Sequence, residues 1–129
     1  MKTVVADTHA AHWFLVDDDR LTPAAAEALV GAERILLPSI CLVEITYLIE
    51  KGRIHAAVMP RLLGELDNPV TTLELAALDM GVVLSLQDIL RSDVPDLPDR
   101  VIAATALHHR VPLVTCDRKI RSCGIETIW

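Results

Sequence analysis

Short apolar runs rich in β-branched residues alternate along the sequence with longer segments of helical composition, and this alternation is what most constrains the fold. The runs at residues 3–6, 34–37, 70–73, 112–115 and 125–129 predict strands. Strands that are separated by helices form parallel sheets, which helices cover on both faces. The sequence therefore predicts an α/β protein, a three-layer α/β/α sandwich with a central parallel sheet of four to five strands.

Start and stop signals bound the helices between these strands. Thr22 before Pro23 is typical of an N-cap and first-turn pair, and Gly52 is typical of a helix end. We expect Thr8 and Ser39 to cap the helices that follow them, and Pro60 to mark a break or a restart of the helix in which it lies. The expected helices are a short one after residue 8 and those at 24–32, 39–51, 54–66, 74–90 and 100–109.

Length, apolar patterning and cysteine spacing narrow the class of protein. The 129 residues have the size of one compact domain, so we expect a single domain over residues 1–129. The apolar runs are short and interrupted, so we expect no membrane span. Asp7 interrupts the N-terminal apolar stretch that a signal peptide would continue, and the three cysteines lack the spacing of a zinc site. We therefore expect a cytoplasmic protein with reduced thiols.

The net charge of −6 has the wrong sign for a protein that grips a phosphate backbone through a generally basic surface. An acidic total is compatible with a nucleic-acid substrate only if bound cations neutralise several acids and bases gather elsewhere. The placement of the acids therefore decides whether such a substrate fits.

Four acidic residues stand among apolar neighbours, where a carboxylate is costly to bury. Asp7 and Asp117 each follow a predicted strand, and the carboxyl ends of parallel strands meet at one edge of a sheet, where ligands bind. Glu44 lies inside an apolar helical segment, and Asp99 begins the last long predicted helix. Buried carboxylates need compensating partners. The strand ends lack a matching set of bases, whereas a divalent cation compensates several carboxylates together.

Convergent carboxylates predict a site for Mg²⁺ or Mn²⁺, which prefer oxygen ligands and bind alongside substrate phosphates. One such ion lowers the pKa of a bound water toward ~7, and a second, ~4 Å away, stabilises the leaving oxygen of a phosphodiester. The cations also offset part of the negative total. Bases beside the site acids are expected to contact the nucleic-acid backbone: Arg100, Arg118, Lys119 and Arg121.

Four segments resemble the motifs of PIN-domain nucleases in their usual order, and together they span nearly the whole chain. They read VADTH at 5–9, SICLVE at 39–44, DLPDRVIAATA at 96–106 and LVTCD at 113–117. The resemblance is to the VapC toxins of type II toxin–antitoxin systems. It implies a PIN-domain fold and hydrolysis of RNA by metal-activated water, leaving a 3′-hydroxyl and a 5′-phosphate. It also implies a homodimer and a small VapB-like antitoxin that neutralises the activity.

The resemblance also assigns roles to individual residues. The acids that bind metal and carry catalysis are Asp7, Glu44, Asp99 and Asp117, with Thr8, Asp96 and Thr115 as supports beside them. Many relatives have Asp-Pro-Phe-Asp where this chain has Asp-Leu-Pro-Asp at 96–99. The proline has moved, so the loop before Asp99 is expected to differ from that of the family while both acids are kept.

Each acid also has a structural interpretation, and two other functions remain open. Asp7 and Asp99 are placed to cap helices, Glu44 to pair with an arginine, and Asp117 to occupy a turn. A receiver-type signalling module also carries acids at strand ends, but it needs a strand-end lysine that this chain lacks at Cys116. A catalytically silent PIN domain that acts in protein binding is the second alternative.

Histidines and aromatic residues add little to the prediction. His9 and His12 stand near Asp7, but no third neutral ligand has suitable spacing, so we do not expect zinc. The aromatic side chains are too few to predict a surface that stacks single strands: Trp13, Phe14, Tyr47 and Trp129. We expect them in the core or at an interface, with Trp13 or Tyr47 able to contact one base if exposed.

Overall fold

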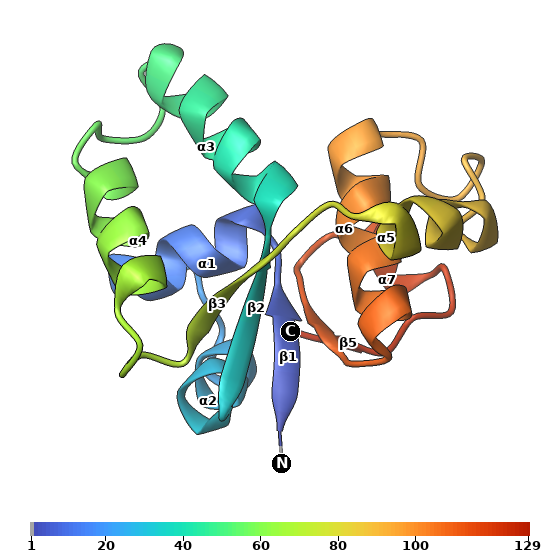
Figure 1. The fold of residues 1–129 in the computed structure, drawn as a ribbon, viewed down its shortest axis with the longest axis horizontal. Coiled ribbons are helices and arrows are strands. Elements are labelled where there is room, and N and C mark those ends of the chain that lie inside the picture. Colours follow the sequence, from blue (N-terminus) through green and yellow to red (C-terminus); the bar gives the residue numbers. More distant parts are fainter. Residues whose placement is uncertain (1) are drawn as a thin grey trace.

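The computed structural model describes residues 2–129 and has a parallel sheet at its centre (Figure 1). Within these residues the sheet has five strands in the order β3-β2-β1-β4-β5. The strands are β1 (Thr3–Ala6), β2 (Arg34–Pro38), β3 (Leu73–Ala76), β4 (Leu113–Val114) and β5 (Thr127–Ile128). Every pair is parallel, and Val5 of β1 lies opposite Leu36 on one side and Leu113 on the other. The predicted α/β class and central parallel sheet are confirmed.

Helices cover both faces of the sheet, as the continuous apolar strands require. α1 (Thr8–Leu15) and α2 (Pro23–Gly31) lie on one face and α6 (Leu97–His109) on the other (Figure 1). The remaining helices are α3 (Ser39–Glu50), α4 (Val58–Asp67), α5 (Met80–Ser85), the 3-10 turn η1 (Leu86–Asp88) and α7 (Arg118–Arg121). Among the described residues, none of these helices has the length and apolar character to cross a membrane.

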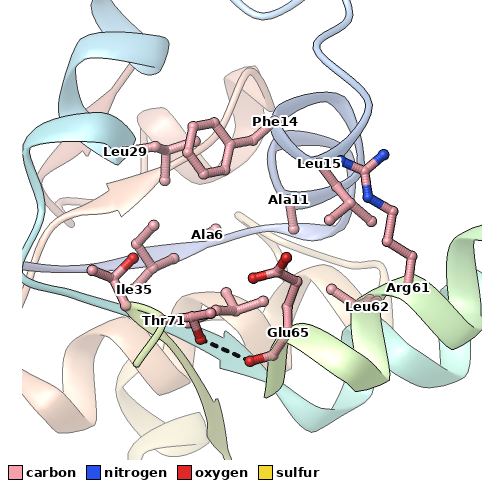
Figure 2. A pocket seen from close by; sticks show the side chains of 12 residues that line it. Ala6, Ala11, Phe14, Leu15, Leu29, Ile35, Arg61, Leu62, Glu65 and Thr71 are labelled. Atoms are coloured by element: carbon pink, nitrogen blue, oxygen red, sulfur yellow. Dashed lines mark hydrogen bonds between the residues drawn. The ribbon is translucent and has the colours of Figure 1, made fainter. Parts of the chain in front are cut away.

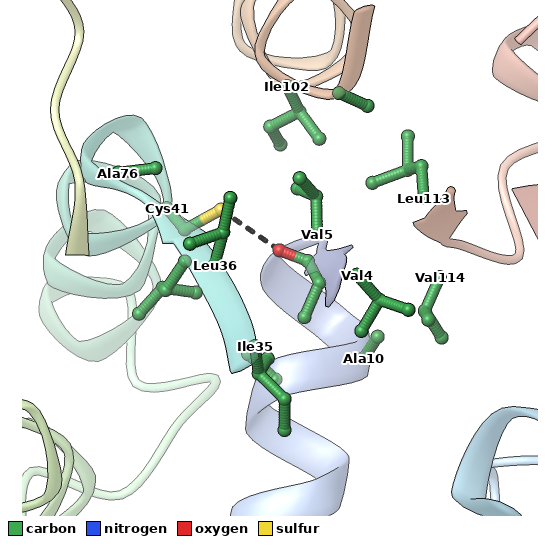
Figure 3. Close-up of a cluster of buried hydrophobic side chains, with 14 of the residues drawn as sticks. Val4, Val5, Ala10, Ile35, Leu36, Cys41, Ala76, Ile102, Leu113 and Val114 are labelled. Carbon is green, nitrogen blue, oxygen red and sulfur yellow. Dashed lines mark hydrogen bonds between the residues drawn. The ribbon is translucent and has the colours of Figure 1, made fainter. Parts of the chain in front are cut away.

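The central strand β1 is buried on both faces. Side chains of a strand point alternately to opposite faces, and Figure 3 shows Val5 and Leu113 directed toward Ile102 of α6. Val4 points to the opposite face, beside Ala10 of α1 (Figure 3). All of these side chains belong to the buried core. The burial fixes the position of Asp7, which follows β1 directly.

Two of the predicted helix signals are confirmed. The Thr22 hydroxyl accepts a hydrogen bond from the Ala25 N–H at 3.1 Å, and Pro23 is the first residue of α2. Gly52 follows α3 with a φ of +73°, a conformation that favours glycine, and its N–H donates to the Ile49 carbonyl at 2.9 Å.

Two other signals act differently from the prediction. Asp7 rather than Thr8 caps α1, because its side chain accepts a hydrogen bond from the Ala10 N–H. Ser39 begins α3 without capping it, and its Oγ accepts a hydrogen bond from the Leu78 N–H at 3.1 Å. Of the two options predicted at Pro60, the structure has the restart: Pro60 lies in the first turn of α4, where no N–H partner is needed.

The third strand and the segment after it are also corrected. The prediction placed a strand at 70–73 and a helix at 74–90, but β3 covers Leu73–Ala76. Asn68 explains the difference, because its carbonyl accepts from the Thr71 N–H at 3.2 Å and its side chain from the Val70 N–H at 3.0 Å. This turn leaves Val70 88% exposed and delays the strand by three residues. Within the helix predicted at 74–90, only α5 and η1 are helical.

We expect truncation of a side chain in β2 to test the strength of this core. Leu37 is 0% exposed, so Leu37→Ala leaves a cavity and is expected to lower the free energy of unfolding by about 2–5 kcal/mol. Val30 of α2 is 75% exposed, so Val30→Ala changes it by less than about 0.5 kcal/mol. Urea denaturation followed by circular dichroism measures both variants. Equal losses would contradict the placement of β2 in the core.

Candidate active site

Asp7 is a buried carboxylate at the carboxyl end of β1. Its side chain is 7% exposed, and Oδ1 accepts a hydrogen bond from the Ala10 N–H at 2.8 Å. Burial raises the pKa of Asp7, while hydrogen bonds from the Thr115 hydroxyl and the Ala10 N–H act in the opposite direction. The capping interpretation of Asp7 is therefore correct, but the cap uses only Oδ1, and the carboxylate also contacts the Thr115 hydroxyl.

Glu44 lies on α3 and is brought to the beginning of α1 by a hydrogen bond between side chains. The Thr8 hydroxyl donates to Glu44 Oε1 at 2.6 Å. Thr8 itself is 4% exposed and stands next to Asp7 in the chain. This contact fixes one oxygen of a half-buried carboxylate beside the end of β1. Thr8, which the resemblance gave a supporting role, thus lies between Asp7 and Glu44, and it does not cap the helix.

Asp99 lies in the first turn of α6, where its N–H donates to Asp96 Oδ2 at 3.1 Å. Its pKa is raised to about 8, first by burial, then by a hydrogen bond to the Asp117 carboxyl and by the negative charges of Asp96, Asp117 and Glu44. Asp99 thus holds a proton at a pH at which an exposed aspartate has lost it. Asp96, which was predicted to support the site, caps α6.

Asp117 follows β4 and caps the short helix α7, where it accepts a hydrogen bond from the Lys119 N–H at 2.8 Å. Its own N–H donates to Thr115 Oγ1 at 3.0 Å, and Thr115 is 0% exposed. Because the same hydroxyl contacts Asp7, Thr115 lies between two of the predicted acids. The sequence predicted this supporting position.

The structure thus brings the predicted acids to one edge of the sheet. The negative charge of Asp117 contributes to the raised pKa of Asp7, and the charges of Asp117 and Glu44 contribute to the raised pKa of Asp99. The thiol of Cys41 lies beneath them, donates to the Ala6 carbonyl at 4.0 Å (Figure 3), and has a raised pKa because of burial. The acids differ in their immediate surroundings, but they share one electrostatic environment.

No base within the described chain neutralises this group. Over residues 2–129 the ion pairs join Arg20 to Asp18 and Arg34 to Glu74, and neither involves the site. Within the same range, no three acidic, histidine or cysteine side chains are close enough together to hold a metal ion as they stand. The carboxylates therefore lack a compensating base, and beside burial their negative charges help to raise the pKa of Asp99.

The bases predicted to contact RNA fall into two sets. Arg100 is engaged inside the protein, where its guanidinium donates to the carbonyls of Ile89 at 2.7 Å and Leu86 at 2.9 Å. It ties the segment before α6 to the helix, a role that its position beside Asp99 did not reveal. The other three bases are exposed on the α7 side of the site: Arg118, Lys119 and Arg121.

A separate cavity of about 190 Å³ lies under α1 (Figure 2). Its walls are mainly apolar and come from α1, α2, β2 and α4, with Leu29, Ile35 and Leu62 among them. Arg61 and Glu65 of α4 supply its charged side chains, and none of the four predicted acids lines it. This mainly apolar cavity and the candidate active site are thus different places in the fold.

The raised pKa of Asp99 predicts how stability changes with pH. The folded state holds the Asp99 proton up to about pH 8, whereas the unfolded chain releases it near pH 4, so this group makes stability fall as pH rises between those values. Asp99→Asn removes the effect and is expected to stabilise the cation-free protein by about 1 kcal/mol at pH 8.

Thermal unfolding in EDTA between pH 4 and pH 8.5 measures this difference. The gain from Asp99→Asn should disappear toward pH 4, and the exposed control Asp19→Asn should show no such trend. A variant that is destabilised equally at every pH would contradict the assignment.

Comparison with known proteins shows the family to which the chain belongs. The family model of the PIN domain matches residues 4–125. Ribonuclease VapC22 of Mycobacterium tuberculosis is 32% identical to the chain over 122 residues, which are 95% of this chain and 92% of that protein.

Solved structures share the fold. A VapBC2 structure from Rickettsia felis, bound to a promoter DNA fragment, has a TM-score of 0.69 and 16% identity over 97% of this chain and 96% of that one. A DNA-bound VapBC from Salmonella typhimurium has a TM-score of 0.68 and 20% identity, covering 98% and 97% of the two chains. With the family model and the curated relative in agreement, the chain belongs to the PIN-domain family and, within it, to the VapC group.

Proposed function

We propose that this chain is a divalent-cation-dependent endoribonuclease that acts as the toxin of a toxin–antitoxin pair. The observation that carries the proposal is the group of four neighbouring carboxylates without a basic partner, one of which keeps its proton to about pH 8. The family supports the same reaction, because the relative from Mycobacterium tuberculosis is a ribonuclease. The single PIN domain expected over residues 1–129 remains part of the proposal, as does the cytoplasmic location.

The donor set fits Mg²⁺ or Mn²⁺. All four side chains offer carboxylate oxygens, which these ions prefer, and repulsion among them is relieved when a cation enters. When bound, such a cation supplies a water of lowered pKa and stabilises charge on the phosphate. The residues proposed to hold it are Asp7, Glu44, Asp99 and Asp117.

The chain's own groups orient these acids. The Thr8 hydroxyl holds Glu44 Oε1, and the Ala10 N–H and the Thr115 hydroxyl hold the Asp7 carboxylate. The Lys119 N–H does the same for Asp117. Asp7 and Asp117 cap helices, and Asp99 lies in the first turn of another, so helix N-termini partly offset the negative charge. This arrangement positions the acids at low cost before any cation arrives.

A cleavage assay tests the proposal. With purified protein, RNA and Mn²⁺, we expect cleavage that EDTA abolishes and that Asp7→Asn, Glu44→Gln or Asp99→Asn lowers by about 100-fold or more, because each loses a charged cation ligand. Asp19→Asn, an exposed acid away from the group, should cleave at the wild-type rate.

The same assay separates the alternatives. Cleavage that survives both EDTA and the acid substitutions would overturn the proposed site. A catalytically silent PIN domain would cut no RNA under any condition. A receiver-type module would take up phosphate from acetyl phosphate on an aspartate and leave RNA intact.

The exposed bases of α7 are proposed to bind the RNA backbone, whereas the Arg100 guanidinium already has partners inside the protein. Replacing Arg118, Lys119 and Arg121 with glutamine is expected to raise KM, leave kcat near wild type, and reduce the salt dependence of binding by a slope of up to about 2. The control pair Lys51→Gln and Arg53→Gln removes exposed bases just beyond the end of α3. An unchanged salt slope in the α7 variant would contradict this role.

Protein partners form the last part of the proposal. The VapB-like antitoxin expected from the sequence agrees with the VapBC complexes that share this fold, and the homodimer expected from the sequence is proposed beside it. Large apolar side chains are exposed on α3 and α5, among them Tyr47 and Met80, and such surfaces are typical of protein interfaces. We propose that the antitoxin suppresses cleavage when it is bound.

A further inference from the structure

A row of stacked side chains extends along α1 away from Asp7. The His9 and Trp13 rings lie nearly parallel, with an angle of 24° between planes and 5.3 Å between centroids. Residues four apart share one face of a helix, which explains the alignment. Trp129, which follows β5, lies 5.9 Å from Trp13, and the Arg20 guanidinium lies 4.8 Å from the Trp13 ring.

This row borders the candidate active site. His9 is two residues after Asp7, and its charge lowers the pKa of that carboxyl. Trp129 lies at the same edge of the sheet, because the Thr115 N–H donates to the carbonyl of the preceding Ile128 at 3.2 Å. An RNA strand with one phosphate at the acids therefore places the neighbouring bases close to this row.

The row is open to solvent at His9. His9 is exposed and Trp13 is half-buried outside the core cluster, whereas Trp129 is half-buried and packs against the core. Asp18 holds Arg20 in place through contacts of 2.8 and 3.1 Å, so the cation beside Trp13 is preorganised. One face of the His9 ring lies against Trp13, and its exposure leaves the other face accessible.

We propose that His9, backed by Trp13, stacks on an unpaired base of the RNA strand next to the cleaved phosphate. Flat side chains stack on bases that are splayed out of a single strand, and a cation beside the aromatic ring strengthens the contact. The inference rests on the proposed ribonuclease function and adds to it a residue that positions the substrate strand, His9. It extends the expectation that Trp13 could contact a base if exposed, because it gives that contact to the His9 ring stacked on Trp13.

Binding without cleavage tests the proposal. In EDTA, tryptophan fluorescence of a Trp129→Phe background reports on Trp13 alone, with an unpaired 12-nucleotide RNA as the probe. His9→Ala is expected to weaken binding about tenfold, the loss typical of one stacked base, and to raise KM in the cleavage assay more than it lowers kcat. His9→Tyr keeps a ring and should bind within about twofold of wild type.

Two controls isolate the base. His55→Ala removes another exposed histidine, at a distance from α1, and should bind as wild type does. In an RNA that lacks one base beside the cleaved phosphate, the parent protein should lose about tenfold in affinity and His9→Ala should lose little more. Additive losses would mean that His9 does not contact that base.

The outcomes distinguish the two proposals. If the parent protein binds and cuts RNA and His9→Ala does so equally well, the stacking proposal is wrong and the ribonuclease stands. If the parent protein neither binds nor cuts RNA, the ribonuclease proposal fails and the stacking proposal fails with it. If His9→Ala instead weakens self-association while RNA binding is unchanged, the row is a protein interface and the stacking proposal is overturned.

Discussion

β1 is hydrogen-bonded to a strand on each side and covered by helices on both faces, and Asp7 is the buried residue that directly follows it. A strand held in this way cannot shift without moving its neighbours. The carboxylate that follows it therefore has a fixed position in a poorly solvated place, where an isolated negative charge is costly. The other acids are arranged around that position by α3, α6 and α7.

The structural and functional interpretations of the acids turn out to be compatible. Asp7 and Asp117 cap helices, which was the alternative to a functional role, yet each cap occupies one oxygen of a two-oxygen group. Capping also directs the positive ends of helices toward the acids. The protein thus tolerates several neighbouring carboxylates because hydrogen bonds and helix N-termini take up part of the electrostatic cost, and the Asp99 proton takes up another part.

The sequence was sufficient to predict the structure wherever a single physical rule determined the local conformation. Apolar runs between helices predicted the parallel sheet, and acids after strands predicted that Asp7 and Asp117 would meet at one edge. Prediction was wrong where a side chain had two options, as with Thr8, whose hydroxyl reaches Glu44 on another helix instead of capping its own. The start of β3 depended on a turn at Asn68 that composition alone did not place. The alignment of His9 with Trp13 needed three-dimensional coordinates, because its signal in the sequence is only a spacing of four.

Arg100 illustrates how proximity in sequence can mislead about function. Its guanidinium holds two backbone carbonyls of the segment that leads into α6, the helix that carries Asp99. Mutagenesis that replaced every basic residue near the acids would find that the Arg100 variant is impaired. Arg100 would then be assigned wrongly to the residues that contact phosphate. The defect would come instead from the loss of the hydrogen bonds that tie the segment before α6 to that helix, and adding more RNA would not restore the activity.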